Sequence, residues 1–209
     1  TRPLDPAALE TPLAAEEAVR RTVARSLGTI CDAVDAALTT GRAVSVGLAG
    51  DALREAREFI SEASGPPESE QEQERLISTL HALDDTSRLA EIAGEKGDLG
   101  WEAGESEDVR ARELCVEAMR SAALIADEAG KARAEKQETE NDTSIAQARG
   151  QLEGCAKALR DLRPAHRRAT LSAVATGTVS ADEAMTRVDI VRRLEALARH
   201  AWLSVKNLT

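Results

Sequence analysis

Apolar residues recur along most of the chain at alternating steps of three and four, the spacing of one face of an α-helix. The cleanest run lies between Ile145 and Ala173. Glycines or prolines punctuate the pattern at Gly41, at Pro66 and Pro67, and at Gly177, where helices commonly end or begin. The pattern predicts six helices, which run over about residues 13–40, 44–63, 68–93, 106–130, 145–176 and 181–205.

Two stretches interrupt this helical pattern. Residues 1–12 contain Pro3, Pro6 and Pro12, so we expect an extended, proline-rich lead-in strap there. Residues 94–105 are rich in glycine and lie near the middle of the chain, which suggests a linker. We therefore predict two tandem three-helix bundles, residues 13–93 and 106–209. The polar run 131–142 reads as solvated helix or as a hairpin.

Composition supports an all-α fold of six long antiparallel helices. Of the 209 residues 42% are hydrophobic but only 1% are aromatic, which suits close-packed helices better than a sheet. The formal net charge of -10 argues against nucleic-acid binding, which depends on lysine and arginine at the phosphates. Cys31, Cys115 and Cys155 lie at apolar helical positions and predict buried, reduced thiols. No cofactor is indicated.

One pattern occurs twice, at residues 83–91 and 194–202. Each copy carries a carboxylate and an arginine four residues apart, Asp84 with Arg88 and Glu195 with Arg199, so both side chains lie on one helix face. Aligning the two copies also brings the neighbouring apolar positions into one phase, which predicts a duplicated helical unit. The pairs read as helix-stabilising ion pairs. A ligand or catalytic role, and a metal site that recruits His200 beside Glu195, stay open as alternatives.

Enzyme chemistry has little support in the sequence. No nucleophile stands at a readable spacing from a base, and no glycine-rich phosphate loop follows a strand. The C-terminal third is locally basic, which fits solvated helix faces or a surface turned toward an anionic membrane; its arginines include Arg163, Arg167, Arg168, Arg192 and Arg193.

The repeated pattern resembles the duplicated signature of the PhoU family, in which each half carries a Leu-Glu-x-x-x-Asp-His-Ala-like stretch on its third helix. Leu83-Asp84, Leu194-Glu195 and His200-Ala201 match that signature as they stand. The opening residues 4–12 and the closing stretch from Gly177 to Trp202 are similar to the cytosolic PhoU-like C-terminal region of bacterial sodium/phosphate cotransporter family proteins.

This resemblance implies a PhoU-like fold and a non-enzymatic regulatory or interaction role in sodium-coupled phosphate transport. The implied partner is the membrane transporter portion of the same or a partner protein, with the chain in the cytoplasm and tethered to the inner face of the cell membrane; a homodimer is left open. The family also implies metal clusters held by paired acids. Here Arg88 and Arg199 replace the second acid of each motif, so we expect no metal. The alternative is a free-standing PhoU-like regulator that binds a metal cluster and a transporter or sensor kinase.

Overall fold

The computed structural model describes residues 4–63, 65–131 and 140–209, and within these it contains helices and no strand. A short 3-10 helix, η1 (Pro6–Glu10), precedes the long helices. These are α1 (Pro12–Thr40), α2 (Gly47–Ser61), α3 (Glu70–Ala93), α4 (Ser106–Ala129), α5 (Glu140–Ala175) and α6 (Ala181–Leu208). The all-α prediction is therefore confirmed for the described part of the chain.

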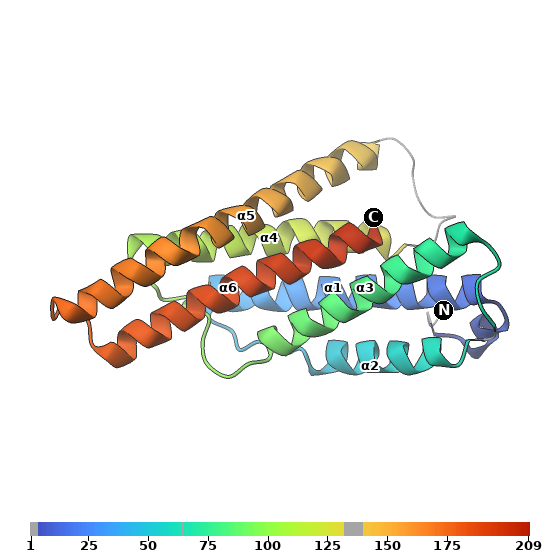
Figure 1. Ribbon diagram of the computed structural model, residues 1–209, viewed down its shortest axis with the longest axis horizontal. Helices are drawn as coiled ribbons and strands as arrows, with labels where there is room; N and C mark the ends of the chain where they lie inside the picture. Colours follow the sequence, from blue (N-terminus) through green and yellow to red (C-terminus); the bar gives the residue numbers. More distant parts are fainter. Residues whose placement is uncertain (1–3, 64, 132–139) are drawn as a thin grey trace.

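The six helices run alternately up and down the long axis of the molecule (Figure 1). Helices α1, α2 and α3 contact one another, and so do α4, α5 and α6. The two halves also meet along their lengths, because α1 packs against α4 and α3 packs against α6. The central helices of the two halves are thus α1, α3, α4 and α6, while α2 covers one side and α5 the other (Figure 1).

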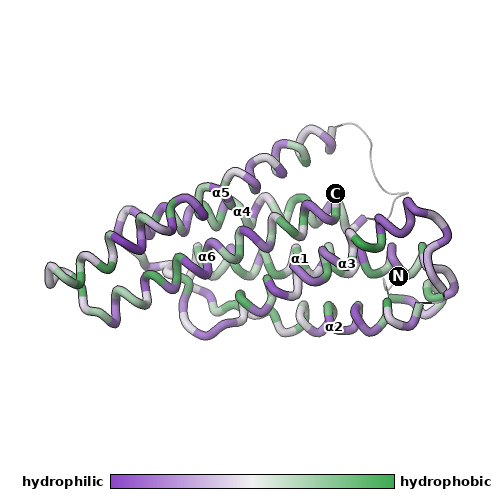
Figure 2. The backbone as a smooth tube through the Cα atoms, viewed as in Figure 1, coloured by the Kyte–Doolittle hydropathy of each residue, from purple (hydrophilic) through white to green (hydrophobic). Residues whose placement is uncertain are grey.

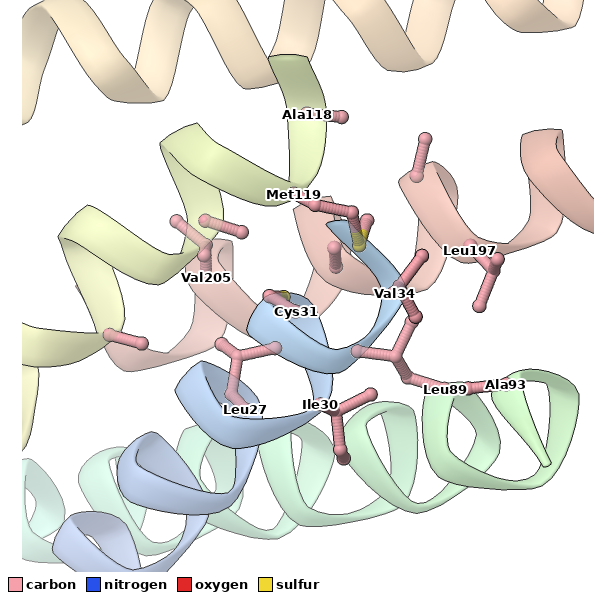
Figure 3. Packing of buried hydrophobic residues seen from close by; sticks show 14 of the residues in the cluster. Leu27, Ile30, Cys31, Val34, Leu89, Ala93, Ala118, Met119, Leu197 and Val205 are labelled. Carbon is pink, nitrogen blue, oxygen red and sulfur yellow. The ribbon is translucent and has the colours of Figure 1, made fainter. Parts of the chain in front are cut away.

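One continuous apolar core runs through both halves. Leu27, Ile30 and Val34 of α1 are fully buried at its centre, and Leu197 of α6 points toward Leu89 of α3 (Figure 3). Hydrophobic and hydrophilic positions alternate along every helix, as the three-and-four spacing requires (Figure 2). Abundant alanine in this core lets the helix backbones approach closely.

The helix ends follow the turn signals in the sequence. Gly41 adopts the left-handed conformation with φ 71° and closes α1. Gly177, with φ 76°, lies in the turn after α5. The hydroxyl of Ser180 accepts a hydrogen bond from the backbone N–H of Glu183 and so caps the start of α6. At the start of α4 the cap position is Glu105, whose side chain makes no capping hydrogen bond, and Ser106 is the first residue of the helix.

The prediction of an extended strap is wrong for residues 6–10, which form η1. Asp5 accepts a hydrogen bond from the backbone N–H of Ala7 at 3.0 Å and so caps this short helix. Pro6 and Pro12 each stand near the start of a helix, where a missing N–H costs nothing because it would have no partner within the helix. Proline therefore begins helices here.

The glycine-rich segment 94–105 connects α3 to α4, and two arginines hold its backbone. Arg193 of α6 donates to the carbonyl oxygens of Glu95 at 3.0 Å and Ile92 at 3.2 Å, with longer contacts to the carbonyls of Gly97 and Asp98. Arg112 of α4 donates to the carbonyl oxygens of Trp101, Ala103 and Gly100. The segment is therefore tied to α4 and α6 at both of its ends.

Cys31, Cys115 and Cys155 are free and buried, as the sequence predicts. Burial raises the pKa of all three thiols, that of Cys155 to about 12, so they stay protonated at neutral pH. The structure places α5 from Glu140 onward, so the polar run predicted over 131–142 lies partly outside the described residues.

Within the described ranges, none of the helices has an apolar stretch sufficient to span a lipid bilayer.

Candidate functional site

The first copy of the repeated motif forms a surface ion pair on α3. The Nε atom of Arg88 lies 3.4 Å from Oδ2 of Asp84, and each side chain is 58% exposed. Such an exposed pair one helical turn apart contributes only about 0.3–0.5 kcal/mol, because water screens both charges. This copy stabilises its own helix and encloses no site.

The second copy is built differently, because its carboxylate is buried. The side chain of Glu195 is 6% exposed on α6, where α5 packs against it. Its Oε1 faces Nε of Arg199 at 3.4 Å, and its Oε2 faces Nη1 of Arg163 on α5 at 3.6 Å. The Oε2 atom is buried and makes no hydrogen bond within the described residues. Two guanidinium groups therefore compensate one buried carboxylate through charge alone.

His200 links the two copies of the motif. Its Nδ1 atom lies 3.1 Å from Oδ1 of Asp85, the residue that follows Asp84 on α3. One turn further along, the buried hydroxyls of Thr86 and Ser204 are hydrogen bonded at 2.9 Å. The structure thus brings His200 to α3, while among the described residues no ion pair or hydrogen bond joins the Asp84–Arg88 pair to the Glu195–Arg199 pair.

These acids do not fit a multinuclear metal cluster. Among the residues that the structure describes, no group of three or more histidine, cysteine, aspartate or glutamate side chains is placed to hold a metal ion. The buried acid, Glu195, already lies between two guanidinium groups that stay charged at any accessible pH. A unit positive charge 4 Å from a metal ion costs roughly 4 kcal/mol per unit of metal charge at an effective dielectric constant of 20.

A second buried polar cluster, which no sequence motif predicts, joins α4, α5 and α6. Oδ1 of Asp108 lies 3.0 Å from Nε2 of His166, and Nη2 of Arg187 donates to Oδ2 of Asp108 at 2.6 Å. Asp108 is 6% exposed and His166 is 3% exposed. Burial opposes ionisation of Asp108, but the hydrogen bonds from His166 and Arg187 outweigh it and lower the pKa of the carboxyl to about 2.

This cluster fastens three helices to one another. Asp108 lies in the first turn of α4, where the helix dipole also favours a negative charge. All its carboxylate oxygens have partners, so the cluster stabilises the packing of the second half. In the sequence, His166 stands out as a polar residue at an apolar position of α5. Its position indicates that the side chain needs a hydrogen-bond partner in the core, but it does not show that the partner is Asp108.

Comparison with known proteins finds no match for this chain among protein-family models, curated proteins or solved structures. The repeated sequence motif, the fold and the buried charges are therefore the basis for proposing a function.

Proposed function

We propose that this chain is a non-enzymatic regulatory or interaction domain of the PhoU type, associated with sodium-coupled phosphate transport. The proposal rests first on the repeated motif with its Leu-Glu and His-Ala elements. The observation that carries the proposal is that both motif acids are held in ion pairs. Glu195 lies between Arg163 and Arg199, and Asp84 is paired with Arg88. The Asp84 pair stabilises its own helix and the Glu195 pairs join α5 to α6, so neither of these two acids is free for metal binding or proton transfer.

The packing of the helices supports a duplicated architecture. Helices α1 and α4 are the first of each half and pack against each other, and α3 and α6 are the third of each half and also pack against each other. Corresponding helices therefore meet across the boundary between the halves, as expected when two copies of one unit associate about an approximate two-fold axis. The PhoU-type arrangement of two three-helix bundles is the proposal that accounts for both the repeat and this pairing.

The proposed role is tested by removing the chain from cells while keeping the associated transporter. Phosphate uptake is measured with labelled phosphate in cells grown at low and at high phosphate. We expect uptake to continue without the chain, but to lose its dependence on phosphate supply. Cells resupplied with the intact chain are the control and should regain that dependence. Uptake that responds to phosphate equally well with and without the chain would contradict the proposal.

A second experiment distinguishes the two forms of the proposal. Sequencing the DNA upstream of Thr1 shows whether the parent gene encodes membrane spans. Hydrophobic spans there support a domain joined to its transporter. A start codon near Thr1, together with stoichiometric iron or zinc in the protein, supports instead a free-standing metal-binding regulator.

A further inference from the structure

An open cavity of about 270 Å³ lies beside the buried Glu195, where α5 packs against α6. Its charged lining consists of Lys157, Arg160 and Arg199 together with the carboxylates Glu153 and Glu195. Trp202 and Ala156 provide its apolar wall. The volume equals that of several water molecules and accommodates one small anion.

The surroundings of this cavity are positively charged although the chain as a whole is acidic. Lys157, Arg160 and Arg163 follow one another on α5 at steps of three, so they share one side of the helix. With Arg199 they make four cations around Glu153 and Glu195. Asp161 pairs with Arg160 at 3.6 Å outside the lining, and counting it still leaves a positive excess of one. The chain as a whole has a formal net charge of -10.

Several hydrogen-bond donors at this cavity have no partner within the described residues. Arg199 directs Nε toward Oε1 of Glu195 at 3.4 Å, which leaves both of its Nη atoms available. Lys157 makes no hydrogen bond or ion pair with another described residue. Glu195, held in place by burial, acts as a positioning residue because it fixes the orientation of Arg199 at the edge of the cavity. A preoriented guanidinium loses less freedom when an anion binds.

We propose that this cavity binds a phosphate group. Guanidinium and ammonium donors that converge on a small cavity match the several acceptor oxygens of a tetrahedral dianion, and charge-assisted hydrogen bonds of this kind are the strong ones. Inorganic phosphate and the phosphate of a small ester share this chemistry. They differ in the organic part, which in an ester would contact the Trp202 wall. The inference goes beyond the proposed function, because it depends on the cavity and not on what the chain regulates.

Isothermal titration of the whole chain tests the site, with inorganic phosphate and a nucleoside monophosphate as separate probes at low ionic strength. We expect saturable binding of at least one probe. Arg199→Gln and Lys157→Gln should each weaken it about tenfold, the effect of losing one charge-assisted hydrogen bond. Arg199→Lys should retain part of the affinity, because it keeps the charge but not the planar fork of donors.

Arg88→Gln is the matched control. Arg88 occupies the same place in the first copy of the motif, pairs with its carboxylate at the same spacing, and does not line this cavity. It should leave the affinity unchanged, while circular dichroism confirms that every variant remains helical. If the nucleoside monophosphate binds more tightly than inorganic phosphate and Trp202→Leu abolishes that difference, the ligand is an ester. Equal affinities for the two probes identify free phosphate as the ligand.

The inference is overturned if neither probe binds saturably, or if Arg88→Gln weakens binding as much as Arg199→Gln. In the second case the anion binds through general surface charge. Either result leaves the uptake experiment untouched, so failure of the phosphate site is distinguishable from failure of the proposed regulatory role.

Discussion

Replacing Arg193 by methionine removes the one fully buried guanidinium that holds the segment between α3 and α4. Arg193 is 2% exposed, and its Nη2 atom donates to the carbonyl oxygens of Glu95 at 3.0 Å and Ile92 at 3.2 Å. Methionine fills similar space and keeps the apolar contacts of the stem, but it donates no hydrogen bond. The change therefore isolates the loss of the guanidinium.

The size of the effect follows from the two shorter hydrogen bonds. Hydrogen bonds from a charged donor are worth about 1.5–3 kcal/mol each, so the pair corresponds to roughly 3–6 kcal/mol. The carbonyls lie in or next to an exposed loop and regain water when the arginine is removed, which places the expected loss near the lower end, about 3 kcal/mol. A domain with a free energy of unfolding of about 5–15 kcal/mol remains folded after such a loss.

Urea denaturation followed by circular dichroism measures this loss. Arg192→Met is the matched control, because Arg192 is the adjacent residue, is 39% exposed, and pairs with Asp189 and Glu95 at the surface. Its removal should cost at most about 1 kcal/mol. Limited proteolysis should also cut residues 94–105 faster in Arg193→Met than in the parent chain, because the segment loses its anchor. Equal losses in the two variants would refute the assignment of Arg193 as that anchor.

Three further predictions follow from other contacts. Asp108→Asn should reduce stability at pH 7 by about 2 kcal/mol, because a carboxyl whose pKa is lowered to about 2 stabilises the fold above its unfolded pKa near 4. The difference should therefore shrink as the pH falls from about 4 to about 2 in urea titrations. Asp84→Asn, which removes only an exposed ion pair, should lower stability at pH 7 by at most about 0.5 kcal/mol. Gly41→Ala should lower stability by more than about 1 kcal/mol and alter tryptophan fluorescence, because φ is 71° there and the added carbon would overlap the Trp101 ring. Gly177→Ala is the control: its φ is 76° but the space around it is open, so it should show only the cost of placing alanine in the left-handed conformation. Elemental analysis should find no stoichiometric iron or zinc, and a chelator should leave the melting temperature unchanged. One tightly held ion per chain would contradict the inference that Arg88 and Arg199 prevent metal binding at the motif acids.

The helices could be predicted from the sequence because each buries one continuous stripe of residues. The register of α5 up to His166, the end of α1 at Gly41 and the start of α6 after Gly177 depend on neighbours within one or two turns, and these local signals agree with the structure. Beyond His166 the predicted register is wrong, because Ala169 is exposed and Thr170 is buried. The second helix is shorter than its apolar pattern, beginning at Gly47 and ending at Ser61. Residues 44–46 contact the core without being helical, since Val44 and Val46 pack against it from the connection.

The buried charges were less accessible to sequence reasoning. The two acids of the repeat look equivalent in sequence, yet Asp84 is exposed and Glu195 is buried, because α5 covers α6 at the second copy. Asp108 and His166 are 58 residues apart, and Arg193 reaches carbonyls about 100 residues before it. Such partners depend on which helices become neighbours, and helical periodicity carries no information about that.

Because α3 packs against α6, the core of the N-terminal half depends on a helix that is synthesised much later. A ribosome releases α3 long before α6, so the first three helices emerge with the face of α3 that receives Leu197 and Ser204 still open to water. The hydroxyl of Thr86 gains its hydrogen-bond partner only when Ser204, 118 residues later in the chain, has been synthesised. The N-terminal half therefore cannot complete its core until α6 has been synthesised, and α6 completes the packing of both halves.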